Sequence, residues 1–124
     1  MKKIENPPTM IEEFNSHWRE WVFKFYESAT RNTLVGIADG DTTPSVFSTE
    51  LLQTENTGAT TITDFDAGYV NQKITIIFGD GNTTVDFTSS NLKGNGGVDW
   101  SPAENDHMTC VYNGTYWFCT ISEN

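Results

Sequence analysis

Few side chains in this sequence could perform acid–base or nucleophilic chemistry. It has two histidines, His17 and His107, and two cysteines, Cys110 and Cys119. His107 and Cys110 are close enough in sequence to pair a thiol with a base. However, a thiol that alternates into a buried strand is normally inert, and no serine lies in a G-x-S-x-G or comparable setting. We therefore predict that the protein has no catalytic site and is not an enzyme.

Acidic side chains could instead bind a cation. They form three groups in the predicted loops: Asp39 with Asp41, Asp64 with Asp66, and Asp80 with Asn82 and Asp86. Calcium favours oxygen-rich loops, but none of these groups has the twelve-residue spacing of an EF-hand. Aspartate next to glycine in a turn usually serves the geometry of that turn. We predict no metal site and no cofactor.

Exposed aromatic rings could bind a sugar by stacking. Tyr69 and Trp100 both lie in predicted loops, and Trp100 follows two glycines in the stretch GGVDWSP. Such a loop could present the indole ring to a glycan. The alternative is that the ring folds back and caps the core. The sequence leaves both open.

Charge is distributed unevenly along the 124 residues, whose net charge is −10. Residues 1–31 contain equal numbers of basic and acidic side chains, whereas residues 32–124 contain only Lys73 and Lys93 against twelve acids. An acidic surface repels phosphate backbones, so we predict no nucleic-acid partner. No segment is apolar enough to span a membrane, and the first residues do not form a secretory signal, so we expect no membrane insertion.

Short strands are expected to position these side chains. From Thr33 onward, seven β-type runs alternate with turn material rich in Gly, Asn and Asp. The runs are TLVGI, SVFSTELLQT, TTITDF, KITIIF, TTVDFTS, MTCVYN and TYWFCTI. The pattern predicts a mainly β fold, a small antiparallel β-sandwich or jelly-roll-like domain over residues 32–124.

Two hairpins are predicted within this domain. Asn113-Gly114 suits a two-residue type I′ turn, which would pair Tyr112 with Thr115 and Val111 with Tyr116. The stretch IIFGDGNTTVDF is expected to form a second hairpin. In the first, Cys110 and Cys119 become diagonal neighbours about 7–8 Å apart. That distance is somewhat long for a disulfide, so two reduced, packed thiols are expected.

Both faces of the final hairpin are apolar. One face would carry Val111, Tyr116 and Phe118, and the opposite face the residues Met108, Cys110, Tyr112, Trp117, Cys119 and Ile121. A surface strand of a monomer normally alternates apolar with polar residues. We therefore expect Tyr116 and Phe118 to be covered by a neighbouring subunit.

The amino-terminal residues 1–31 are expected to form an arm and a helix instead of strands. Residues 1–8 are expected to form an extended Pro-rich arm, and residues 9–31 an amphipathic helix that begins with a capping box at Thr9 and Glu12. An apolar stripe follows the helix at Ile11, Phe14, Trp18, Trp21, Val22 and Phe25. The stripe could lie across its own β domain or meet copies of itself around a symmetry axis. We predict the second arrangement, in a homotrimer.

The motif that runs from Ile62 to Trp117 resembles small trimeric β-domain modules of bacteriophage structural proteins. The matching positions are Ile62, Thr63, Phe65, Gly68, Gln72, Ile74 to Phe78, Asn113, Gly114 and Trp117. Such modules occur at the ends of tail fibres and spikes, on tail-needle tips, and as head fibres or cement proteins. The resemblance covers about residues 60–120, concerns packing residues and implies an architecture rather than an active site.

The resemblance implies a non-enzymatic protein of the virion, synthesised in the host cytoplasm. The expected form is a homotrimeric knob, capsid decoration or tail-needle-like piece, with the arm docked onto capsid or tail components. The alternative is a tail-fibre or spike tip that attaches to a host receptor or surface glycan through Tyr69 and Trp100.

Overall fold

The computed structural model describes residues 33–124 of the chain, which divides into two units, Met1–Arg31 and Asn32–Asn124. The predicted arm, the predicted helix and its stripe from Ile11 to Phe25 lie outside the described residues. The described part is mainly β. Its strands are β1 (Leu34–Gly36), β2 (Leu51–Thr54), β3 (Thr60–Ile62), β4 (Lys73–Phe78), β5 (Thr83–Val85), β6 (Leu92–Lys93), β7 (His107–Tyr112) and β8 (Trp117–Ser122). A 3₁₀ turn, η2, spans Asn95–Gly97.

Each of the seven predicted β-type runs overlaps one strand. The prediction is closest for KITIIF, which is β4 from its first residue to its last. It missed β6, because Leu92–Lys93 is a two-residue strand in a stretch that reads as loop.

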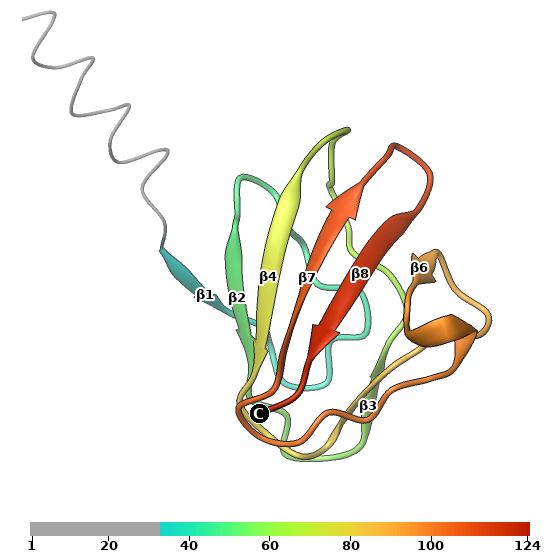
Figure 1. The fold of residues 1–124 in the computed structure, drawn as a ribbon. Helices are drawn as coiled ribbons and strands as arrows, with labels where there is room; N and C mark the ends of the chain where they lie inside the picture. The colour runs from blue at the N-terminus through green and yellow to red at the C-terminus, as the bar shows by residue number, and fades with distance from the viewer. Residues whose placement is uncertain (1–32) are drawn as a thin grey trace, which may run out of the picture. The chain divides into compact units, whose positions relative to one another are not determined.

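The strands form two sheets. Six lie in one sheet in the order β1-β2-β4-β7-β8-β6, and β3 pairs with β5 in a smaller sheet (Figure 1). Four of the six strand pairs are parallel: β1 with β2, β2 with β4, β3 with β5, and β6 with β8. The predicted antiparallel sandwich is therefore wrong in its strand directions, although the mainly β class is confirmed.

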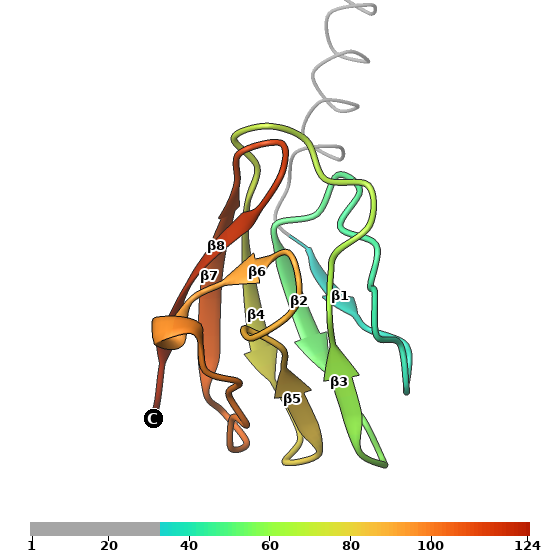
Figure 2. The ribbon, with the colours of Figure 1, turned by 90° about the vertical axis from the view of Figure 1, so that its right-hand side faces the viewer.

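The parallel pairs arise because the chain coils between the two sheets. After β2 it passes to β3 in the small sheet, returns to β4 beside β2, and passes again to β5 beside β3 (Figure 2). Parallel neighbours cannot be joined by a tight turn, so each return requires a crossover. Between β2 and β4, and between β3 and β5, a strand of the opposite sheet supplies the crossover, in place of the helix of a βαβ unit.

The second predicted hairpin is wrong for the same reason. β4 and β5 belong to different sheets, so the GDGN segment between them carries the chain across the domain. Gly79 allows this exit, since a Cβ atom there would lie 2.5 Å from the carbonyl oxygen of Thr54. Asp80 then accepts hydrogen bonds from the backbone N–H groups of Asn56 (2.7 Å) and Asn82 (2.8 Å), which fixes the turn.

The core lies between the two sheets and is lined by alternate residues of the strands. Fully buried side chains include Leu52, Ile76, Phe78 and Trp117. Trp117 is the largest of them, and its ring meets Phe65 edge-on at 5.3 Å and stacks on Tyr112 at 4.6 Å. Gly68 packs against the same indole, where a Cβ atom would lie 2.5 Å from a ring carbon. Two residues of the motif, Phe65 and Gly68, thus pack against a third, Trp117.

The final hairpin has the predicted faces but a different register. Tyr112 pairs with Trp117 and Val111 with Phe118, so the loop has four residues instead of two. The Asn113 carboxamide oxygen accepts from the N–H groups of Thr115 (2.9 Å) and Tyr116 (2.7 Å), which stabilises the longer loop. The register differs by two residues, and side chains alternate with period two, so every side chain keeps its predicted face.

We expect Gly68→Ala to destabilise the domain, because the added methyl group must displace the Trp117 ring. Overpacking of this kind costs about 1–3 kcal/mol. Urea denaturation followed by tryptophan fluorescence measures the loss. Gly58→Ala is the matched control, since no atom lies within 4 Å of its added Cβ. Equal stability of the two variants would contradict the described packing.

Candidate functional site

Gln72 joins the loops at one end of the domain. Its side chain is almost fully buried, at 2% exposure, and its amide nitrogen donates to the backbone oxygens of Val46 (2.7 Å) and Thr49 (3.1 Å). Its carboxamide oxygen accepts from the N–H of Tyr69 at 3.2 Å, and its backbone oxygen accepts from the N–H of Tyr112 at 3.0 Å. One residue therefore fixes three chain segments that are distant in sequence.

These loops expose large apolar side chains. Phe47 is 72% exposed, Tyr69 58% and Val70 60%. Gly114 of the final hairpin approaches Val70, since a Cβ atom there would lie 3.1 Å from a methyl carbon of Val70. We call Phe47, Tyr69 and Val70 the apolar loop end. Because Gln72 holds the loops beneath them, these side chains are presented on a fixed backbone.

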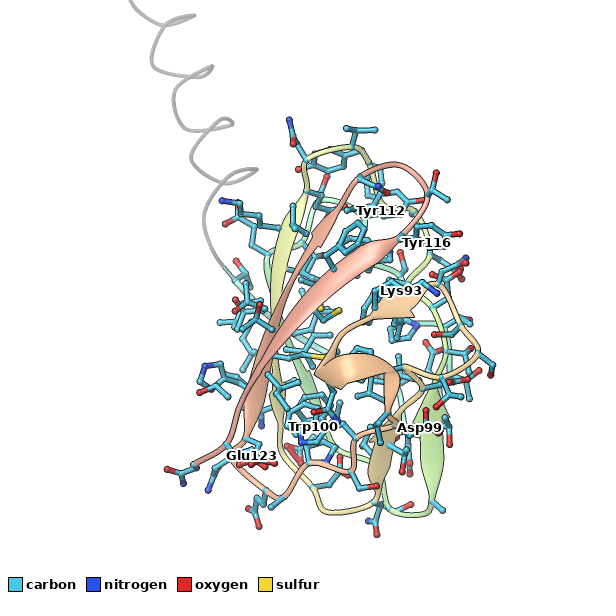
Figure 3. The ribbon with its side chains drawn as sticks, turned by 45° about the vertical axis from the view of Figure 1, so that its right-hand side comes forward. Lys93, Asp99, Trp100, Tyr112, Tyr116 and Glu123 are labelled. Atoms are coloured by element: carbon cyan, nitrogen blue, oxygen red, sulfur yellow. The ribbon has the colours of Figure 1, made fainter. Side chains whose placement is uncertain are left out.

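A second apolar surface lies on the outside of β8. Tyr116 and Phe118 are 38% and 45% exposed, and their rings meet edge-on at 6.3 Å. The Lys93 ammonium lies 4.7 Å from the centre of the Tyr116 ring and also donates to the Ser90 carbonyl at 3.0 Å (Figure 3). No side chain among residues 33–124 buries this aromatic pair. The sequence placed both rings on this face, but the approach of Lys93 depends on β6, which it missed.

Trp100 is not available for stacking on a sugar. Its side chain is buried at 5% exposure, its ring meets Phe78 edge-on at 5.3 Å, and its indole N–H donates to Glu123 at 3.0 Å (Figure 3). Backbone bonds between Trp100 and Val85 add the segment to β5. The alternative that the ring folds back onto the core therefore describes it, and Trp100 is corrected from a glycan contact to a core residue. Tyr69 is the predicted contact that remains exposed.

The two thiols lie directly opposite each other. Cys110 pairs with Cys119 across β7 and β8, which corrects the diagonal placement predicted from the shorter loop. Both are free and buried. Burial, followed by the hydrogen bond to the neighbouring Cys119, raises the pKa of Cys110 well above its usual value. His107, by contrast, is exposed and lies three residues before Cys110 on β7. Because side chains alternate along a strand, His107 points away from the thiols.

The carboxylates of the acidic loop residues accept hydrogen bonds from backbone N–H and hydroxyl groups of the same domain. Thr57 donates its hydroxyl and backbone N–H to Asp39, at 2.6 Å and 3.0 Å, and this lowers the pKa of Asp39. For Asp86, the backbone N–H of Ser89 is the main cause of a lowered pKa. Partial burial opposes ionisation of Asp80, but hydrogen bonds outweigh it and the pKa of Asp80 is also lowered. These carboxylates act as structural acceptors.

No group of three metal-ligating side chains occurs within residues 33–124. In the same range, none of the helical turns could cross a membrane. Comparisons with protein-family models, with curated proteins and with solved structures find no match. The described surface includes two apolar regions, the apolar loop end and the Tyr116–Phe118 pair.

We expect neither cysteine to react with iodoacetamide in the folded protein. Alkylation requires a thiolate, and burial keeps Cys110 protonated and both sulfur atoms out of reach. Both should react after unfolding in guanidinium chloride, which mass spectrometry detects as two added carbamidomethyl groups. Rapid labelling of the native protein would contradict the placement of the hairpin face.

Acid should destabilise the domain through its hydrogen-bonded carboxylates. Because folding lowers their pKa values, they stabilise the fold above the unfolded pKa of 3.8, and this contribution is lost as the pH falls through their folded values. Asp80→Asn should cost about 1–2 kcal/mol at about pH 7, where it removes charge-assisted hydrogen bonds, and less at about pH 3.

Urea denaturation at both pH values measures this difference. Glu104→Gln, at an exposed loop position, is the control and should follow the parent protein. A cost of Asp80→Asn that is equal at both pH values would show that its ionisation does not stabilise the fold.

Proposed function

We propose that this protein is a non-enzymatic structural component of a bacteriophage virion. Three copies would associate as a compact knob, a capsid decoration such as a head fibre or cement protein, or a tail-needle-like piece. The arm over residues 1–8 would attach the trimer to a capsid or tail protein. The β domain would point into solvent.

The observation that carries this proposal is the uncovered aromatic pair at the start of β8. Tyr116 directly precedes the strand and Phe118 lies on its outer face, while its other face is buried in the core through Trp117 and Cys119. Aromatic side chains on an otherwise polar surface are typical of protein interfaces. Association would bury them, as the predicted trimer requires.

The resemblance to trimeric phage modules gains support from the packing of its motif. Phe65 and Gly68 contact Trp117, while Gln72 organises the loops. These positions pack and form hydrogen bonds within the described domain. A motif with that role fits a structural protein whose function is assembly.

Assembly also explains how a short arm could attach firmly. Three arms on one symmetric trimer bind as a multivalent unit, so that weak individual contacts give strong overall attachment. The mechanism is mechanical: self-association buries aromatic surface and presents three arms together.

We expect the full chain to be a trimer in native mass spectrometry, at three times the 13.9 kDa of one chain. Removal of residues 1–8 should leave the trimer intact but abolish incorporation into phage particles, because the arm is the proposed anchor. Particle incorporation is measured by complementing a phage that lacks the intact gene. A monomeric full chain, or normal incorporation without the arm, would contradict the proposal.

A second candidate function is attachment to a host receptor or surface glycan at the apolar loop end. The favouring observation is that Phe47, Tyr69 and Val70 are exposed on loops that Gln72 fixes. Sugar rings stack on such aromatic side chains. Selective binding on a glycan array that Tyr69→Ala abolishes, with Val98→Ala as the control at another exposed apolar position, would favour this function.

A further inference from the structure

The outer side of the six-stranded sheet carries no carboxylate at any strand position. The residues that point away from the core on its strands are Leu34, Gly36, Leu51, Gln53, Lys73, Thr75, Ile77, Lys93, His107, Thr109, Val111, Phe118, Thr120 and Ser122. We call this set, together with Tyr116, the carboxylate-free face. Acidic side chains directly flank three of these strands: Glu50 and Glu55 on either side of β2, Asp106 before β7 and Glu123 after β8. Of these, Glu55 accepts a hydrogen bond from Gln53 at 2.8 Å.

Both lysines of the described residues lie on this face, in a single row. Strand pairing places four residues side by side across β4, β7, β8 and β6: Lys73, Val111, Phe118 and Lys93. Two ammonium groups therefore flank an apolar centre. Tyr116 extends that centre, since its ring packs against both Phe118 and Lys93.

The twelve carboxylates of residues 33–124 all lie outside the eight strands. Three of them follow the strands of the smaller sheet, at Asp64, Asp66 and Asp86, and Asp99 directly precedes Trp100, which pairs with β5. The domain is thus strongly acidic around its loops and weakly basic on one sheet face. A chain with this charge distribution is complementary to itself.

We infer that the carboxylate-free face contacts the acidic loops of a neighbouring copy in the trimer. The contact joins two different surfaces, so the lysines of one copy meet carboxylates of the next. This inference rests on the proposed trimer and adds which surface of the β domain forms its interface.

A contact between two identical faces does not suit this surface. Packing one carboxylate-free face on another would bury Lys73 and Lys93 without any acidic partner, and an unpaired buried charge is costly. A three-fold ring, by contrast, is built only from contacts between two different surfaces. The absence of carboxylates also removes like-charge repulsion from the aromatic centre of the contact.

Charge reversal on the full-length protein tests this assignment. Lys73→Glu/Lys93→Glu and Phe118→Ser should each weaken the trimer at least tenfold at about 50 mM salt, measured by native mass spectrometry over a dilution series. The effect of the lysine change should shrink at about 500 mM salt, because salt screens the lost attraction.

Two matched control variants test whether these effects are specific to the carboxylate-free face. Lys2→Glu/Lys3→Glu makes the same charge change in the arm, and Val98→Ser makes a similar truncation at an exposed residue outside the sheet. Both controls should leave the trimer affinity within about twofold of the parent protein. The urea midpoint of each variant shows whether it is folded.

Carbodiimide crosslinking identifies which segment contacts the carboxylate-free face. It joins lysine to a carboxylate in direct contact, and a mixture of ¹⁴N- and ¹⁵N-labelled chains separates links between copies from links within one. Links from Lys73 or Lys93 to loop carboxylates of another copy are the expected result. Links only to residues 1–32 of the same chain would overturn the inference, because that segment would then cover the face.

The outcomes separate this inference from the proposed function. A trimer that neither the lysine nor the Phe118 change weakens would leave the structural role standing and place the interface elsewhere. A parent protein that stays monomeric would overturn both.

Discussion

The buried carboxamide of Gln72 holds the described domain together at the point where its segments diverge. Three parts of the chain meet there: the turn before β2, the connection into β4, and the start of the β7–β8 loop. The Gln72 carboxamide bonds carbonyl groups of the first part and an N–H group of the second, and its backbone bonds the third. A buried polar side chain is favourable only when its own groups are bonded, and Gln72 uses both ends of its amide. The exposed positions of Phe47 and Tyr69 depend on this arrangement.

Alternation along the sequence was sufficient to predict the positions of all strands except β6, and the faces of the final hairpin. Period two determines which side chains share a face, and an error of two residues in register leaves that result unchanged. The register itself was wrong, because Asn-Gly favours a two-residue turn while the Asn113 side chain stabilises a four-residue loop. The hydrogen bonds of the Asn113 side chain therefore outweigh the turn preference of Asn-Gly, and the dipeptide alone does not reveal these bonds.

The parallel coil could not be predicted from alternation, which is the same for parallel and antiparallel strands. The sequence nevertheless contains one indication of the parallel arrangement. Thr60-Thr61-Ile62 and Thr83-Thr84-Val85 are near repeats, and they pair in register as β3 and β5. Repetition at a fixed spacing is typical of chains that coil. The burial of Trp100 could not be predicted for another reason: it depends on contacts with Phe78 and Glu123, which are distant in sequence.

Charge placement links this fold to the proposed assembly. Each crossover between the sheets ends in a polar turn, and aspartate fixes several of these turns by accepting backbone N–H groups, as Asp80 does. The coil thus concentrates negative charge in the loops, while the outer sheet face keeps only uncharged and basic side chains. Copies of such an acidic domain repel one another over most of their surface. The face with Lys73, Phe118 and Lys93 is where that repulsion is weakest, which is the reason for proposing that copies of the domain meet there.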